Sequence, residues 1–173
     1  LNRDALSIDE AALPFKGQDI WTGYELSWLN TKGKPQVAVA IFTFECQSSH
    51  IIESKSFKLY LNSLSQCCFT SMDAAQAMIS TALSECVGSS VNVLVFSMPD
   101  YLSESATFEN ANSNSKKLPA VILLDDLAVA CTEYHYSPEL LHNAADAKAG
   151  ARVEEYLCSH LLRSNCPVTD QPD

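Results

Sequence analysis

The strongest structural signal in the sequence is a strand–turn–strand pattern in its first third. Residues 20–29, IWTGYELSWL, are rich in the aromatic and β-branched residues that favour strands. The Gly and Pro of TKGKP at 31–35 predict a turn. Residues 36–46 then alternate between two faces, neither of them strongly polar, which indicates a strand buried on both sides. Together these segments predict a long β-hairpin.

A helix is expected after the hairpin, over residues 51–64. The apolar side chains of Phe57 and Leu61 recur at a spacing that fits a helix better than a strand, and Ser54 or Ser56 is expected near its N-terminus.

The middle of the chain predicts a second helix and a third strand. The helix is expected at 72–86, with Asp73 as its cap and Gly88 at its end. Residues 91–97, VNVLVFS, read as a strand. The polar segment 99–118 predicts a solvated loop.

The last third of the chain is expected to add strands and a helix. Residues 119–136 carry two strand-like runs around Asp125 and Asp126, which resemble an exposed turn more than a metal site. Residues 153–162, VEEYLCSHLL, have apolar positions three and four apart and predict a helix. This element order predicts the α+β class, with an antiparallel sheet and helices packed on one face. It lacks the βαβ alternation and GxGxxG motif of a Rossmann nucleotide site.

The composition limits which binding partners and which cellular compartment are expected for this protein. The net charge of −10 over 173 residues disfavours nucleic acid and anionic membranes as partners. No apolar run approaches the ~18 residues of a transmembrane helix, and no signal peptide is predicted. The seven cysteines include no CxxC pair, and the histidines lack zinc-ligand spacing. We expect reduced thiols, most of them small core residues, in a cytoplasmic protein without a metal.

Two stretches contain candidate catalytic or binding residues, and the first is SHLLRSNCPVTDQPD at 159–173. Cys166 and Asp173 could place a thiol nucleophile and an acid on one pocket wall. The alternative is a cysteine of a helix-ending turn and an aspartate at the surface.

The second stretch is IIESKSFK at 51–58. Glu53 next to a helix N-terminus could accept hydrogen bonds from a planar donor edge such as that of a guanine-like base. The helix amides, with Ser54 and Lys55, could receive a phosphate. The alternative is a solvated amphipathic helix with ordinary salt bridges. His50, just before this stretch, is more typical of a loop residue.

Both stretches resemble motifs of the 7-cyano-7-deazaguanine (preQ0) reductase family in its two-module form. ESKSFKLYLNS at 53–63 is similar to the signature helix of that family, and the 159–173 stretch is similar to its nucleophile segment. LPFKGQDIWTGYELSWLN at 13–30 and KPQVAVA at 34–40 resemble its opening hairpin. The resemblance implies a tunnelling fold (T-fold), with a first module over 1–150.

The resemblance also implies the reaction. The family reduces the nitrile of preQ0 to the aminomethyl product preQ1 in queuosine biosynthesis, a tRNA-modification pathway, with NADPH as the reductant. By similarity, Cys166 would form a covalent thioimide with the nitrile and Asp173 would donate a proton. Ile52, Glu53 and Ser54 would bind the substrate, and Ser54 and Lys55 would contact NADPH.

The family pattern also carries expectations about the extent and assembly of the protein. Residues 151–173 would begin a second module with the nucleophile helix, so the chain corresponds to the N-terminal portion of the two-module form. A homo-oligomer is expected, a homodimer in the full-length form. Two alternatives stay open: a non-catalytic deazapurine-binding or assembly module, and another tunnelling-fold pterin or purine enzyme. Enzymes of the latter kind usually need zinc ligands, for which no suitable His/Cys set is present.

Overall fold

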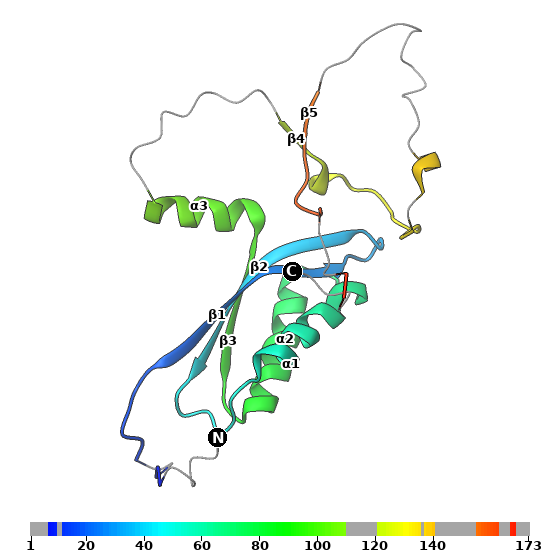
Figure 1. Ribbon diagram of the computed structural model, residues 1–173. Coiled ribbons are helices and arrows are strands. Elements are labelled where there is room, and N and C mark those ends of the chain that lie inside the picture. The colour runs from blue at the N-terminus through cyan, green and yellow to red at the C-terminus, as the bar shows by residue number, and fades with distance from the viewer. Residues whose placement is uncertain are drawn as a thin grey trace, which may run out of the picture.

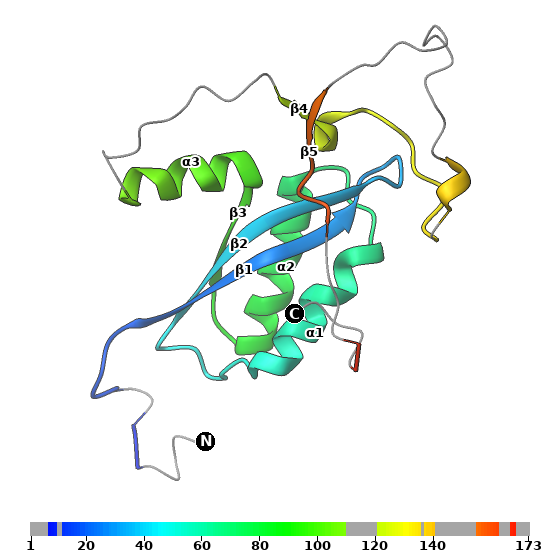
Figure 2. The same ribbon diagram turned by 45° about the horizontal axis from the view of Figure 1, so that its top comes forward.

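The computed structural model describes six segments of the chain: residues 7–9, 12–109, 121–135, 137–140, 155–162 and 167–168, with only the backbone of 104–109. An antiparallel sheet of three strands is the centre of the structure, and its strand order is β1-β2-β3. Two helices, α1 and α2, lie together on one side of this sheet (Figures 1 and 2). No helix among the described residues is long and apolar enough to cross a membrane.

The predicted hairpin is confirmed. Strand β1 (Gln18–Leu29) pairs antiparallel with β2 (Pro35–Glu45), and the pairing runs from Gln18 opposite Glu45 to Leu29 opposite Pro35. The side chain of Asn30 closes the turn by accepting from the backbone N–H groups of Lys32 and Lys34. Gly33 has a φ of 73°, a left-handed conformation that glycine adopts without steric cost.

The two predicted helices are present as α1 (Ser54–Ser63), which continues into the short 3-10 helix η2 (Leu64–Gln66), and α2 (Met72–Val87). The expected cap of α2 is wrong: Ser71, not Asp73, accepts a hydrogen bond from the backbone N–H of Ala74. Ser71 has the extended backbone of an N-cap, whereas Asp73 already lies in the first turn. Gly88 ends α2 with a φ of 68°, as expected.

The hydrophobic core fills the space between the sheet and these two helices. Strand β3 (Val91–Ser97) is confirmed and pairs antiparallel with β2. The core side chains come from all three strands and both helices and include Leu26, Ala38, Ala40, Phe42, Phe44, Phe57, Ile79, Leu83, Val91 and Val93. Burial of this apolar surface is the main force that holds α1 and α2 on the sheet.

The opposite face of β2 is covered less than the sequence suggests. Val39 is buried, but Val37, Ile41 and Thr43 on the same face are only half-buried. The reason is that α1 and α2 pack only on the other face, that of Phe42 and Phe44. On the Val39 face, the ring of Phe96, whose strand position pairs with Val39, meets a tyrosine from a third helix.

That third helix corrects the loop predicted at 99–118. Helix α3 spans Met98–Glu109, and residues 110–118 lie outside the described residues. Pro99 is compatible with the first turn of a helix, where its missing N–H has no intrahelical acceptor. Ser97 Oγ accepts from the backbone N–H of Asp100 and so satisfies one amide of that turn.

The described residues after α3 contain a short parallel pair of strands. Strand β4 (Val121–Leu123) pairs with β5 (Tyr156–Cys158), and the 3-10 turns η3 (Leu124–Asp126) and η4 (Pro138–Leu140) lie between them in sequence. Of the two strand-like runs predicted at 119–136, only the first is a strand.

The helix predicted at 153–162 is wrong. Tyr156–Cys158 is extended and pairs with β4, and residues 159–162 form no helix; 153 and 154 lie outside the described residues. Pairing with a distant strand outweighs the local helical spacing here. The α+β class and the antiparallel sheet are confirmed, with α1 and α2 together on one face. Helix α3, which meets Phe96 through Tyr101, and the parallel β4–β5 pair are additions to the expected arrangement.

Candidate functional site

The first turn of α1 is organised by Glu53, which is its N-cap. The carboxylate accepts hydrogen bonds from three donors: the backbone N–H of Lys55 at 2.9 Å to Oε1, and the backbone N–H and the hydroxyl of Ser56, both at 2.7 Å to Oε2. Ser54 and Ser56 are the first and third residues of α1 and so lie near its N-terminus, as expected, but the cap itself is Glu53. Glutamate is an unusual cap, but its longer side chain here reaches the amides of two residues at once.

These contacts keep Glu53 ionised. The hydroxyl of Ser56 and then the backbone N–H groups of Lys55 and Ser56 lower the pKa of the carboxyl below its ordinary value of 4.5. All three donors stabilise the charged form. The start of α1 thus carries an exposed carboxylate whose position and charge are both determined by the helix.

The neighbouring predicted residues lie where the sequence places them, around this carboxylate. Ser54 and Lys55 are exposed, and Ile52 is half-buried and packs against the core. Lys58, three residues after Lys55, is also exposed on α1. Two lysines at this spacing project from neighbouring positions of a helix, where their ammonium groups and the hydroxyl of Ser54 form a donor set suited to a phosphate.

Two hollows flank the start of α1. One, of about 400 Å³, lies between α1 and α2 and is lined by Ile52, Glu53, Ser56 and Tyr60, among others. The other, of about 360 Å³, lies between α1 and β1; Ser54 and Lys58 border it, and Trp21 and Phe57 form part of its apolar wall. The rings of Trp21 and Phe57 meet edge to face, with centroids 6.0 Å apart. Glu53 and Lys58 therefore face different hollows of the same helix.

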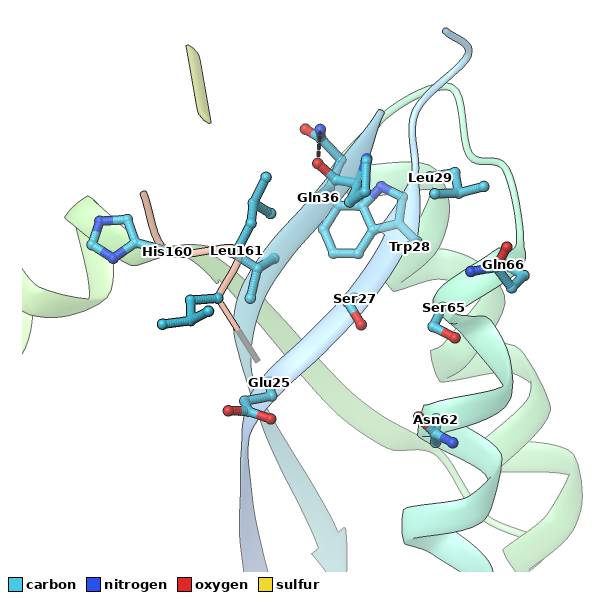
Figure 3. Close-up of a pocket in the computed structure, with 13 residues that line it drawn as sticks. Glu25, Ser27, Trp28, Leu29, Gln36, Asn62, Ser65, Gln66, His160 and Leu161 are labelled. Carbon is cyan, nitrogen blue, oxygen red and sulfur yellow. Dashed lines mark hydrogen bonds between the residues drawn. The ribbon is translucent and has the colours of Figure 1, made fainter. Parts of the chain in front are cut away.

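A third pocket, of about 420 Å³, lies at the other end of α1 (Figure 3). Its lining includes Glu25 and Trp28 of β1, Asn62 of α1, and His160 and Leu161 from the segment after β5. In Figure 3, His160 and Leu161 stand on one side of the pocket, and Asn62 stands on the opposite side. Glu25 and Asn62 also line the hollow between α1 and β1, so the two spaces are neighbours along β1.

Cys166 and Asp173 lie outside the described residues, so their roles stay predictions. The structure describes residues 159–162 and 167–168 of their stretch, and residues 160–162 line the pocket at the end of α1 opposite to Glu53. The ten residues of α1 extend over about 15 Å.

The described cysteines correct one expectation. Six thiols, those of Cys46, Cys67, Cys68, Cys86, Cys131 and Cys158, are free of disulfides, as expected. None of these six is buried, so the interpretation of most cysteines as core residues is wrong for them. No group of three or more potential metal ligands occurs among the described residues. His50 is a loop residue as expected, and its ring nitrogen contacts Ser49 Oγ at 3.1 Å.

Sequence reasoning did not find Lys34. It is only 6 % exposed and is the one buried charged side chain in the part of the chain that the structure describes. Its ammonium group donates to the backbone carbonyl oxygens of Asp125 and Leu127. Nothing in TKGKP distinguishes this lysine from Lys32, because its partners lie more than 90 residues away in sequence.

A family model described as "Nitrile reductase, 7-cyano-7-deazaguanine-reductase N-term" matches residues 1–95, more than half of the 173 residues. The chain belongs to this family. The matched part includes the hairpin, α1 with Glu53, and α2. Membership of the nitrile reductase family agrees with the resemblance carried by the ESKSFKLYLNS motif.

Named relatives extend this similarity over the whole chain. The chain is 47 % identical over 173 residues to the NADPH-dependent 7-cyano-7-deazaguanine reductase of Colwellia psychrerythraea, covering all of this chain and 58 % of the relative. Proteins of the same name from Chromobacterium violaceum and Dechloromonas aromatica are 44 % and 47 % identical over 99 % and 100 % of the chain, and 56 % of each is covered. The chain thus spans somewhat more than half the length of these curated relatives.

Proposed function

We propose that this chain takes part in the NADPH-dependent reduction of the nitrile of 7-cyano-7-deazaguanine (preQ0) to the aminomethyl group of preQ1, a step of queuosine biosynthesis. The observation that carries this proposal is the match to the nitrile reductase family over the residues that form the hairpin and α1. The names of the relatives, at 44–47 % identity, support the same substrate and the same reductant.

Glu53 would bind the deazaguanine ring. The N–H groups along the pyrimidine edge of such a ring are donors, and an ionised carboxylate is their natural acceptor. A carboxylate offers about four acceptor positions, and three are used by Lys55 and Ser56. Two donors from the substrate would therefore displace at least one capping bond. Ile52, which lines the same hollow, and Ser54 would complete the contact with the ring.

Ser54 and Lys55 would bind NADPH through its phosphates. Both are exposed, Lys58 adds a second cation, and a hydroxyl with two ammonium groups is a chemically suitable set for a phosphate. When bound, NADPH supplies the hydride that reduces the substrate carbon. The residues of α1 then hold the two ligands next to each other.

Cys166 would act as the nucleophile and Asp173 as the proton carrier. The thiol gives its proton to the Asp173 carboxylate, and the sulfur forms a bond to the nitrile carbon. One carbon–nitrogen π bond opens, and the nitrogen receives the proton from Asp173 to give a thioimide. Two hydrides and two protons then convert the thioimide into the primary amine and the free thiol, so two NADPH are consumed for each nitrile.

The number of residues between Leu162 and Cys166 is compatible with a site shared by Cys166 and Glu53. Cys166 is four residues beyond Leu162, which lines the pocket at the end of α1. Four extended residues reach up to about 14 Å. This reach is comparable to the length of α1, so the thiol could meet a ligand held by Glu53.

We also propose that the sheet with α1 and α2 is the tunnelling-fold module, assigned to residues 1–150, and that 151–173 begin a second module. Strand β1 supports this through its outer edge, which pairs among the described residues only at Leu29, with Cys68. Ile20 and Tyr24 of β1 are 64 % and 62 % exposed. Such an edge is usually covered by another strand. A homo-oligomer, a homodimer in the full-length form, would cover it, and sedimentation analysis would measure its mass.

Intact mass spectrometry after incubation with preQ0 tests the proposal. We expect an increase equal to the mass of the nitrile, because the thioimide retains every atom of the substrate. The Cys166→Ala variant should show no increase, and oxidation of NADPH at 340 nm should follow the same pattern. Binding of preQ0 without adduct or NADPH oxidation would contradict the reductase and favour a deazapurine-binding module.

A further inference from the structure

Asp125 holds the segment that leads toward the proposed nucleophile. Its two carboxylate oxygens accept from two consecutive residues of that segment: Oδ1 from the hydroxyl of Ser159 at 2.6 Å, and Oδ2 from the backbone N–H of His160 at 2.8 Å. The Ser159 hydroxyl oxygen in turn accepts from the backbone N–H of Leu161 at 3.2 Å. One side chain, 34 residues away in sequence, thus organises the turn that follows β5.

Asp125 is itself fixed by the buried lysine of the hairpin turn. Lys34 Nζ donates to the backbone oxygen of Asp125 and, at 2.7 Å, to that of Leu127. A buried ammonium group that lost these acceptors would carry a large desolvation cost, so the contact is costly to break. Two further bonds tie the same region to the turn: the Tyr134 hydroxyl donates to Gly33 O at 2.6 Å, and Cys131 N donates to Lys32 O at 3.0 Å.

The contacts therefore form a continuous connection from the rigid hairpin to the pocket of Figure 3. Lys34 fixes the main chain of Asp125, and the carboxylate of Asp125 fixes Ser159 and His160. His160 and Leu161 then line the pocket beside α1. The parallel pairing of β4 with β5 brings the two segments together, but it ends at Cys158. Beyond it, residues 159 and 160 are held by hydrogen bonds to Asp125.

We propose that Asp125 is a positioning residue for the nitrile reduction: by holding residues 159–161 against the hairpin it sets the point from which the chain runs to Cys166. This inference rests on the proposed function, in which Cys166 attacks the nitrile. A displacement of the attacking atom by about 1 Å can lower a rate about a hundredfold, so the geometry of this turn matters for the covalent step. Asp125 touches neither the substrate nor the reacting atoms in this role.

The adjacent aspartate provides a matched control. Asp125→Asn removes one negative charge and replaces one of the two acceptor oxygens by a donor NH2 group, so the N–H of His160 or the hydroxyl of Ser159 loses its acceptor. Asp126→Asn removes the same charge from the same 3-10 turn, and its exposed carboxylate bonds to none of the described residues. We expect Asp125→Asn to slow the maximal rate of adduct formation with preQ0 by about ten- to a hundredfold, and Asp126→Asn to leave it within about twofold.

The concentration dependence separates positioning from binding. Glu53 lies at the opposite end of α1, so the half-saturating preQ0 concentration should change by less than about threefold in Asp125→Asn. The pair Ser159→Ala and Ser159→Thr adds a rescue, because only threonine keeps the hydroxyl that donates to Asp125. Ser159→Ala should slow the formation of the adduct, and Ser159→Thr should keep most of the wild-type rate. Hydrogen exchange at the His160 amide should rise in Asp125→Asn and stay low in Asp126→Asn.

The outcomes distinguish this inference from the proposed function. If the wild-type protein forms no adduct, the proposed function fails, and the role of Asp125 fails with it. If the wild type reacts but Asp125→Asn reacts equally fast, the role of Asp125 alone is overturned. If Asp126→Asn slowed adduct formation as much as Asp125→Asn, the effect would be one of charge, and the positioning role of Asp125 would again be overturned.

Discussion

Of the three donors that stabilise the carboxylate of Glu53, the hydroxyl group of Ser56 lowers its pKa most. Ser56 Oγ donates to Glu53 Oε2 and is the largest cause of the lowered pKa of this carboxyl. A carboxyl whose pKa is lower in the folded than in the unfolded chain stabilises the fold at pH values above the unfolded value. That stabilisation is lost as the pH falls through the folded-state value. For Glu53 it is complete well above pH 4.5 and disappears in the acid range below it.

Ser56→Ala should therefore weaken the acid dependence of stability. Without the hydroxyl, the pKa of Glu53 rises toward its ordinary value, so the loss of melting temperature between about pH 6 and pH 3 becomes smaller than in the wild type. Ser56→Thr, which keeps a hydroxyl, should behave like the wild type. Circular dichroism melts across this range measure the effect. Ser54→Ala is the control, because its hydroxyl bonds to none of the described residues. Identical slopes for Ser56→Ala and the wild type would contradict the prediction.

At the scale of elements, α1 is held on the sheet mainly by Phe57. This ring is 5 % exposed and meets the rings of Trp21, Phe42 and Phe44 edge to face, with Phe42 nearest at 4.8 Å between centroids. The residues proposed to bind the ligands, at the start of α1, are positioned by this contact, because Phe57 lies just after them in the same helix.

We expect Phe57→Ala to lower the free energy of unfolding by about 3–5 kcal/mol, the range for removal of a buried aromatic ring. Leu59→Ala, in the same helix but 42 % exposed, should cost less than about 1 kcal/mol. Urea unfolding followed by circular dichroism measures both. Similar losses for the two variants would mean that Phe57 is not the main contact between α1 and the sheet.

Two elements also show where local sequence patterns fail to predict secondary structure. VEEYLCSHLL has the spacing of a helix, yet residues 156–158 form β5, because β4 offers backbone partners that the local sequence does not reveal. The polar segment after β3 begins with Pro99 and reads as a loop. It starts as α3 instead, because Pro is compatible with a first turn and Ser97 caps that turn.

At the scale of the whole molecule, Lys34 joins the hairpin to the segment after β4. We expect Lys34→Met to lower the free energy of unfolding by about 1.5–3 kcal/mol, because it removes charged hydrogen bonds and leaves two carbonyl groups without their donor. Lys32→Met, in the same turn but exposed, is the matched control and should be nearly neutral. Thermal and urea unfolding measure both variants. Equal stability of the two would contradict a joining role for Lys34.

The sequence by itself determined the hairpin, the positions of α1 and α2, the third strand and the family, because these depend on alternation, helical spacing, turn residues and motifs within short stretches. It also located Glu53, Ser54 and Lys55 correctly at the start of α1. Only the tertiary structure decided that β5 is a strand, and that Lys34 and Asp125 connect the hairpin to residues 159–161. The reason is physical: these features depend on burial and on hydrogen bonds between segments far apart in the chain, which no local pattern encodes.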